Sequence, residues 1–186
     1  EGTLTVTNRD AKYEITVTAK SATEKYDGTE KSVSGLVTTT FTVEGNTYTV
    51  SGLTAEAKAT DAGTYTSAVT GTAVVKDSDG NDVTAQFSVK TENGTLTVSK
   101  RNVTITSESA TKQYDGTALT KHEVKVTGDG FVEGQGADYS YTGSQKLVGS
   151  SENFFSYTLK EGTKADNYNI TTANGTLTVT DRETKY

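Results

Sequence analysis

The single histidine of this chain limits the chemistry that its side chains could perform. His122 is the only imidazole and cysteine is absent, so a nucleophile would depend on one base, and no Gly-x-Ser-x-Gly elbow presents a serine. The stretch 128–134 resembles a dinucleotide-binding loop, but its third glycine comes one residue late and no strand–helix–strand unit surrounds it. We interpret His122 as an exposed strand residue and the glycine-rich stretch as a turn. The sequence predicts no enzyme and no catalytic residue.

The acidic stretch 77–82 is a candidate metal site. Its sequence, Asp-Ser-Asp-Gly-Asn-Asp, offers several oxygen ligands of the kind that Ca²⁺ prefers. However, the glycine is at the fourth position rather than the sixth, and Ser88 stands where a bidentate glutamate would close an EF-hand loop. We favour a hairpin turn and expect no cofactor, with weak calcium binding as the alternative. The calcium ligands would be Asp77, Asp79, Asn81 and Asp82.

Aromatic rings are the other side chains with binding chemistry, because sugars stack on aromatic faces. Tyr26 and Tyr114 each precede Asp-Gly-Thr, a sequence typical of a strand that enters a tight turn, so a packing role is the favoured interpretation. Phe154 and Phe155 are adjacent and cannot both point inward from one strand, so one should form an exposed apolar spot. The candidate ligand contacts are Tyr26, Tyr114, Tyr141 and Phe154.

Composition excludes several classes of partner. The 18 basic and 24 acidic residues give a net charge of −6 without any basic cluster interleaved with aromatics, which argues against nucleic acid and anionic membranes. No apolar run reaches the length of about 20 residues that a membrane helix needs, so we expect no membrane contact within the chain. The apolar residues are mostly Val, Leu, Tyr and Phe, and threonine is abundant, which favours strands over helices.

Internal repeats divide the chain. The pentapeptide GTLTV begins at Gly2, Gly94 and Gly175, and the element SATxxYDGT occurs at 21–29 and again at 109–117. The order of the two elements is the same in both copies, which indicates tandem modules of about 80 to 90 residues. We therefore predict that 1–8 is the closing strand of a preceding repeat, 9–98 a first module and 99–186 a second module.

Short alternating segments in the first module predict its fold. Strands are expected near 14–19, 38–43, 47–50, 64–69, 72–75, 83–89 and 94–98, and the only helix-like stretch is Ala55–Ala59. We expect an all-β protein of two tandem antiparallel, immunoglobulin-like β-sandwich modules, with β-grasp-like modules as the alternative. The Asn-Gly before GTLTV is interpreted as a turn with positive φ, and Asp-x-Gly-x-Tyr at 61–65 is similar to a tyrosine corner. The junction 99–102 lacks Gly and Pro, so we expect the modules to lie end to end with limited bending.

The second module resembles a known repeat family. The Tyr-Asp-Gly-Thr element, the segments 141–145 and 148–153, and Asp-Asn-Tyr-Asn-Ile at 166–170 resemble the YDG and MBG repeat modules of large bacterial surface proteins. The first module departs from this pattern in its middle, where it carries 61–65 instead. The resemblance implies tandem arrays in adhesin stalks, extracellular and either secreted or wall-attached, with neighbouring repeats as partners. It also implies the alternative of a module that binds host mucin or other glycans.

Overall fold

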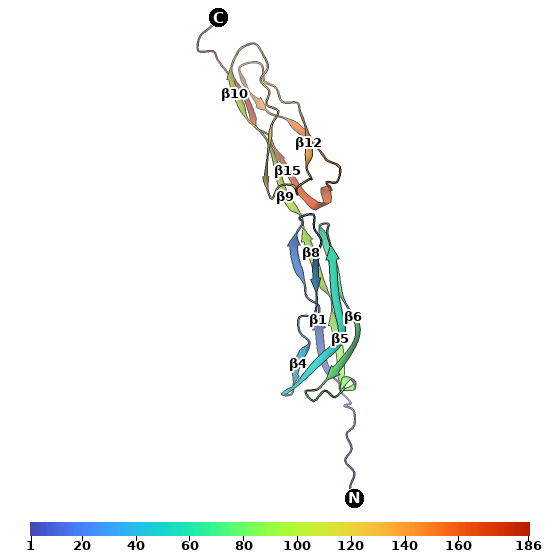
Figure 1. Cartoon of the computed structure of the whole chain (residues 1–186). Helices are drawn as coiled ribbons and strands as arrows, with labels where there is room; N and C mark the ends of the chain where they lie inside the picture. Colours follow the sequence, from blue (N-terminus) through green and yellow to red (C-terminus); the bar gives the residue numbers. More distant parts are fainter. The chain divides into compact units, whose positions relative to one another are not determined.

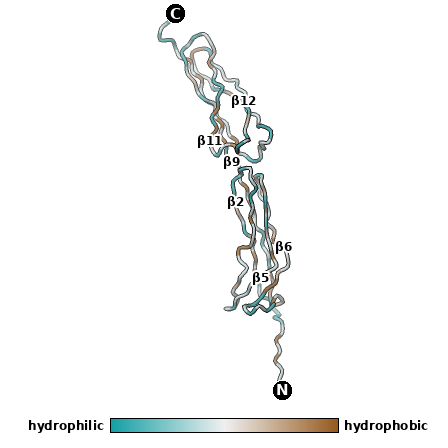
Figure 2. Tube along the Cα trace, viewed as in Figure 1, coloured by the Kyte–Doolittle hydropathy of each residue, from teal (hydrophilic) through white to brown (hydrophobic).

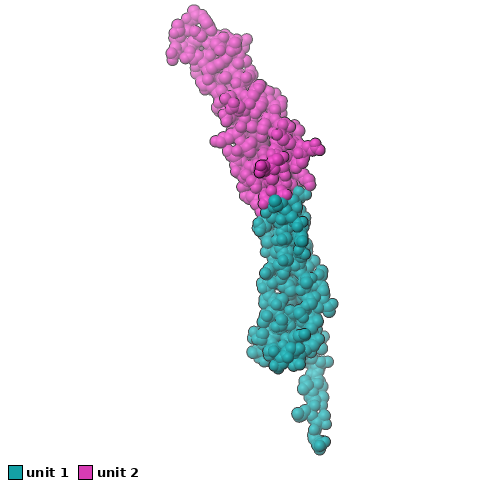
Figure 3. All heavy atoms as spheres, viewed as in Figure 1, with its two compact units in different colours: residues 1–24, 29–99 teal, residues 25–28, 100–186 magenta.

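The computed structural model describes residues 1–186 and is all-β, with sixteen strands and two three-residue 3-10 helices. The residues form two compact units: unit 1 comprises 1–24 and 29–99, and unit 2 comprises 25–28 and 100–186 (Figures 1 and 3). Segment 25–28 therefore belongs to unit 2, although unit 1 residues precede and follow it in the chain. The structure contains no helix that could cross a membrane.

Unit 1 consists of a six-stranded sheet and a separate parallel pair. The sheet has the order β2-β8-β6-β5-β3, and β4 adds to β5. The parallel pair joins β1 to β7, the first and seventh strands. The strand bounds are β1 Tyr13–Thr18, β2 Ala22–Lys25, β3 Lys31–Ser34, β4 Thr40–Val43, β5 Asn46–Ala59, β6 Gly63–Lys76, β7 Phe87–Glu92 and β8 Gly94–Ser99, with η1 at Thr84–Gln86.

Alternation along the strands produces the core of unit 1. Ile15 and Val17 of β1 lie two residues apart and so face the same side, where they pack with Val50, Val75 and Phe87. Leu96 and Val98 of β8 are also fully buried, at 0% and 2% exposure. Figure 2 shows the consequence, since apolar and polar positions are interspersed along the strands.

Unit 2 is built from three small sheets. Their orders are β11-β9-β15, β10-β16-β13 and β12-β14. The buried side chains are again two residues apart, Val103 with Ile105 and Leu177 with Val179, each at 1% exposure or less. The strand bounds are β9 Arg101–Ser107, β10 Ala110–Gln113, β11 Val124–Gly128, β12 Ala137–Tyr141, β13 Gly149–Glu152, β14 Phe155–Leu159, β15 Tyr168–Ala173 and β16 Thr176–Thr180, with η2 at Ala165–Asn167.

The all-β prediction is confirmed, but three details of the predicted fold are wrong. The pairs β1–β7, β9–β15 and β10–β16 are parallel, so the sheets are not wholly antiparallel. The stretch Ala55–Ala59 belongs to strand β5 and is not helical, because Ala55 and Ala57 both point to the buried side of the sheet. The β-grasp alternative fails for the same reason, since the two three-residue helices cannot cross a sheet.

The glycine of the repeated GTLTV element has a different role from the predicted turn. Gly94 and Gly175 do not have positive φ. A Cβ at Gly94 would lie 2.2 Å from the carbonyl oxygen of Lys20, and one at Gly175 would lie 2.4 Å from that of Ser107. Glycine is therefore required because the backbone passes too closely for any side chain. The tyrosine-corner contact, in contrast, is present, since Tyr65 Oη donates to the carbonyl oxygen of Asp61 at 2.8 Å.

Candidate functional site

In both units the first strand pairs in parallel with a strand near the end of the unit. In unit 1 the register runs from Tyr13 opposite Phe87 to Thr18 opposite Glu92, and β8 follows directly after β7. In unit 2, β9 pairs in the same way with β15, and β16 follows directly. Each unit thus ties the segment where the chain enters to the segment where it leaves by a ladder of backbone hydrogen bonds.

A buried tyrosine is the most elaborate side-chain site in unit 2. Tyr26 is 4% exposed, and its ring meets that of Tyr168 edge to face at 5.8 Å. Gln135 bonds both rings, because its Nε2 donates to Tyr26 Oη at 2.8 Å and its Oε1 accepts from Tyr168 Oη. The backbone N–H of Val132 also donates to Tyr168 Oη at 3.1 Å. Burial raises the pKa of Tyr168, so this phenol stays neutral and can donate.

Charged groups fix the backbone around the same tyrosine. Lys25 Nζ donates to Asp129 Oδ1 at 2.6 Å, and Asp129 Oδ2 accepts from the backbone N–H of Asn102 at 2.8 Å. The Lys25 bond and the Asn102 bond hold the pKa of Asp129 below its usual value. Arg101 donates to the carbonyl oxygens of Tyr26, Asp129 and Gly130. One guanidinium therefore ties segment 25–28 to the loop after β11.

The segment also requires a glycine. Gly28 has a φ of +82°, and a Cβ there would lie 3.2 Å from Val132 Cγ1. Together these residues form what we call the Tyr26 socket, in which segment 25–28 fills a site made by residues of 100–186. The socket consists of Lys25, Tyr26, Gly28, Arg101, Asp129, Val132, Gln135 and Tyr168.

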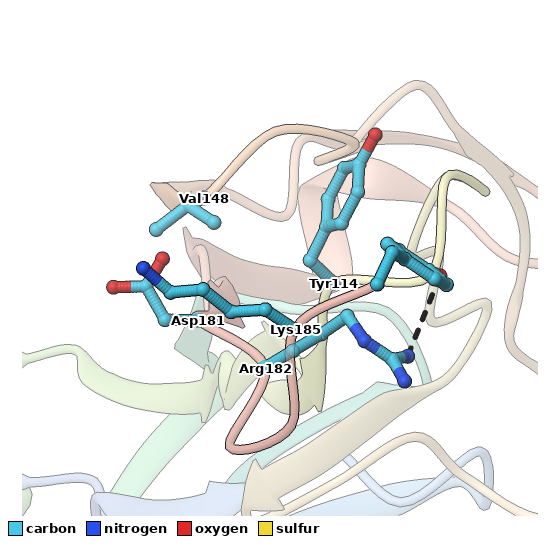
Figure 4. Close-up of a pocket in the computed structure, with 6 residues that line it drawn as sticks. Tyr114, Val148, Asp181, Arg182 and Lys185 are labelled. Atoms are coloured by element: carbon cyan, nitrogen blue, oxygen red, sulfur yellow. Dashed lines mark hydrogen bonds between the residues drawn. The ribbon is translucent and has the colours of Figure 1, made fainter.

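Tyr114 occupies the same repeat position as Tyr26 but has different surroundings. Its side chain is half-buried and lines an open pocket of about 180 Å³. The other lining residues are Val148, Asp181, Arg182, Lys185 and Tyr186 (Figure 4). The two tyrosines that the repeat predicts to be equivalent are therefore not equivalent in their contacts.

The remaining predicted aromatic contact, Tyr141, lies on an aromatic face. Tyr139 and Tyr141 of β12 pair with Tyr157 and Phe155 of β14, so all four rings share one side of this two-stranded sheet. His122 stacks on Tyr141 with ring centroids 5.0 Å apart and planes 9° apart. Burial raises the pKa of Tyr139 and of Tyr141. We call these five residues the aromatic face; His122 is exposed, as predicted, but lies outside any strand.

Phe154 lies outside the aromatic face. It is 50% exposed, whereas Phe155 is half-buried, so one of the two adjacent phenylalanines is exposed as predicted. The backbone N–H of Phe154 bonds Glu152, and its carbonyl oxygen accepts from Thr142 and Gly143. The structure therefore does not bring the four predicted contacts together in one place.

The acidic stretch forms a turn whose carboxylates are occupied by its own backbone. Asp77 Oδ1 accepts from the N–H groups of Asp79 and Asn81 at 3.0 and 2.9 Å. Asp82 Oδ1 accepts from both the N–H and the hydroxyl of Thr84. These bonds lower the pKa of Asp77 and of Asp82. The side chains act here as turn-stabilising acceptors.

Two functional features escape the sequence patterns. The parallel ladder joins residues such as Tyr13 and Phe87 that lie in separate motifs, and no short-range pattern reports such pairing. The socket residue Gln135 lies directly after the glycine-rich stretch 128–134, which the sequence indicates only as a turn. The available sequence signal is Phe131, an aromatic residue inside this stretch, and in the structure its ring centroid lies 5.1 Å from that of Tyr168.

Comparison with known proteins gives no independent assignment. No protein-family model matches the chain, and no curated protein or solved structure is significantly similar to it.

Proposed function

We propose that the chain is a non-catalytic structural segment, a stalk or spacer of an extracellular bacterial surface adhesin, secreted or wall-attached. The parallel pairing of the entering and leaving segments in both units is the observation that carries the proposal. A load applied along the chain pulls β1 from its N-terminal end and β8 from its C-terminal end. Because β1 and β7 are parallel, this load shears all the ladder bonds together instead of breaking them one at a time.

Tandem repetition supports the same proposal. Residues 2–7 have the sequence GTLTVT, which is identical to 175–180, where Leu177 and Val179 are 0% and 1% exposed in a central strand. In segment 1–7, however, Leu4 and Val6 are 101% and 98% exposed. This apolar side matches the strand that a preceding module of the same kind would bury, and it makes neighbouring repeats the natural partners.

The strand arrangement within each unit suggests which class of β-sandwich the units belong to. We infer that the two units are tandem sandwich modules related to the immunoglobulin-like fold. The tyrosine-corner bond from Tyr65 to Asp61 supports this assignment for unit 1. The YDG and MBG resemblance of unit 2 agrees with a repeat of this class.

Force spectroscopy in two pulling directions tests the spacer function. Pulling the chain from its two ends loads β1 and β7 in shear. Pulling through cysteines introduced as Lys12→Cys and Ala85→Cys, two exposed positions just before β1 and β7, peels the same two strands apart. We expect unit 1 to unfold at a clearly higher force in the first direction. Equal unfolding forces in the two directions would remove the mechanical basis of the proposal.

The aromatic face favours a second candidate function, binding of mucin or other host glycans. The rings of the aromatic face, three of them half-buried and two exposed, gather on one side of β12 and β14 and form a surface on which sugar rings can stack. A glycan array probed with the chain and with its Tyr141→Ala variant tests this candidate. Saturable binding that the variant loses, with Phe154→Ala as a matched aromatic control outside the face, is the expected result. Binding that survives in Tyr141→Ala and disappears in Phe154→Ala would place the ligand elsewhere.

A further inference from the structure

Segment 175–186 repeats segment 2–13 of the same chain. Nine of the twelve aligned residues are identical, and the three differences place Asp181, Glu183 and Thr184 where the first copy has Asn, Asp and Ala. The similarity therefore continues beyond the GTLTV strand into the residues that follow it. Tyr186 has the repeat position of Tyr13, which is the first residue of β1.

The two segments also fold into the same turn. The guanidinium carbon of Arg9 lies 3.9 Å from the ring centroid of Tyr13, and that of Arg182 lies 4.1 Å from that of Tyr186. In each copy the arginine Nε donates to the carbonyl oxygen two residues later, at 2.8 and 2.9 Å. In each copy a terminal nitrogen of the arginine also donates to the tyrosine hydroxyl, at 3.1 and 3.4 Å.

In unit 1 the tyrosine of this turn packs against the rest of the unit. Tyr13 packs against Phe87 with ring centroids 5.5 Å apart, and its hydroxyl donates to Glu44 Oε2 at 2.8 Å. The Glu44 bond is the largest cause of the raised pKa of Tyr13. The ring of Tyr186, in contrast, is 87% exposed.

The polar groups of the second turn match those that unit 1 uses. Gln86 of unit 1 accepts from the backbone N–H of Arg9 at 2.9 Å and donates to Asn8 Oδ1 at 2.6 Å. In the second copy, Arg182 offers the same backbone N–H and the carboxylate of Asp181 offers the same kind of acceptor oxygen. A glutamine in the position of Gln86 would therefore find both partners.

The turn at 181–186 lies beside the YDG tyrosine of unit 2. Tyr114, Val148, Arg182 and Tyr186 line one open pocket (Figure 4). The equivalent tyrosine, Tyr26, accepts through its carbonyl oxygen from Arg101, which follows Gly94 at the same distance as Arg182 follows Gly175. In both copies the YDG tyrosine therefore lies next to the arginine that follows the GTLTV strand.

We propose that this pocket is a docking site for a further module of the unit 1 type, in which Tyr186 takes the position of Tyr13. The incoming module supplies the counterparts of Phe87, Gln86 and Glu44 and covers Tyr114 and Val148. The inference rests on the proposed spacer function and names the partner of this pocket. The two proposals can fail independently. The pulling test of the spacer function concerns only the ladder inside unit 1, whereas the docking site is tested at the pocket of unit 2.

A fusion in which residues 14–99 follow Tyr186 directly tests the docking site. The chain contains no cysteine, so a single Val148→Cys substitution provides a unique alkylation site at the pocket, where Val148 is 50% exposed. We expect alkylation of this cysteine to be at least tenfold slower in the fusion than in the 186-residue chain. A Val126→Cys control, at a position 38% exposed on β11, should react equally fast in both proteins.

Three results of the fusion experiment would contradict the proposal. Equal alkylation rates at position 148 with a folded third module would overturn the docking site. A third module that does not fold would overturn the assignment of Tyr186 to the position of Tyr13. A second fusion carrying Asp181→Asn, Glu183→Asp and Thr184→Ala restores the sequence of segment 2–13, so folding only in this version would also contradict the proposal.

Discussion

The contrast between Tyr26 and Tyr114 shows how the same residue can acquire different roles at one repeat position. The sequence around both is Tyr-Asp-Gly-Thr, yet Tyr26 is 4% exposed in its socket and Tyr114 is half-buried at an open pocket. Burial of Tyr26 also means that its ring face is not available for stacking against a sugar. The glycan alternative therefore cannot use Tyr26 and depends on the aromatic face around Tyr141.

Removal of the Tyr26 ring should destabilise unit 2. We expect Tyr26→Ala to lower its free energy of unfolding by about 3 to 5 kcal/mol, because the change leaves a cavity beside Tyr168. Tyr26→Phe should cost about 1 to 2 kcal/mol through the lost bond from Gln135. Urea unfolding followed by the NMR signals of unit 2 measures both changes. Tyr114→Ala is the matched control, and an equal loss in that variant would contradict the socket.

Asp129 predicts a pH dependence for the same unit. Its folded pKa lies below the ordinary value of 3.8, so its contribution to stability is complete above that value and is lost as the pH falls through the lowered pKa. Asp129→Asn should therefore lower the Tm of unit 2 near neutral pH, and the difference from the unchanged chain should shrink below about pH 4. Thermal unfolding from pH 7 to pH 2 measures this, and a Tm difference that grows on acidification would refute it.

At the scale of elements, the GTLTV strand is central to each unit. Leu177→Ala should destabilise unit 2 by about 3 kcal/mol, because this side chain is fully buried. Leu4→Ala changes the same position of the same pentapeptide in a segment where the side chain is fully exposed, and it should leave thermal unfolding of the chain unchanged. A comparable loss in both variants would show that segment 1–7 packs against the chain.

The acidic turn at 77–82 should hold its shape without a metal. Its carboxylates already accept bonds from the backbone of Asp79, Asn81 and Thr84. We expect the Tm of unit 1 to be the same in calcium and in chelator, as measured by calorimetry. A rise of several degrees in calcium that Asp77→Ala abolishes would instead establish the alternative of a calcium site.

Elements whose signals are local could be predicted from the sequence, and elements set by long-range pairing could not. Alternation predicted β1, β4 and β8 within about two residues, because burial of one face imposes a period of two. The short strands β2 and β3 carry little such signal, since each has at most one buried residue. Parallel pairing of β1 with β7 depends on residues that are far apart in the chain. The sequence of neither strand indicates which strand it pairs with.

The whole chain connects its units more than once. It leaves unit 1 after Glu24, contributes 25–28 to unit 2, returns at Thr29 and leaves again after Ser99. The repeat identified Tyr26 as a recurring residue. It did not predict that Tyr26 packs in unit 2, because a repeated sequence carries no information about the residues that its side chains contact. Unit 2 is therefore not the same as the module 99–186 expected from the repeat boundaries.

A fragment of residues 100–186 should be less stable than unit 2 in the whole chain. The fragment lacks Lys25, Tyr26 and Gly28, so Asp129 loses its bond from Lys25 and Tyr168 loses its ring contact with Tyr26. We expect a lower Tm for the fragment, and a synthetic peptide of residues 20–31 should raise it, whereas the same peptide with Tyr26→Ala should not. A fragment as stable as unit 2 in the intact chain would show that segment 25–28 is dispensable.

The parallel ladders determine the order in which strands can pair while the chain is synthesised from its N-terminus. Strand β1 has no strand partner until β7 has been made, and β9, which pairs with β11, lacks its parallel partner until β15 has been made. Packing of segment 25–28 comes still later, because its contact residue Tyr168 lies near the C-terminal end of the chain. Such distant contacts slow folding, since a long loop must close before any of them forms. Each unit should therefore complete its fold only after its last strands have been made.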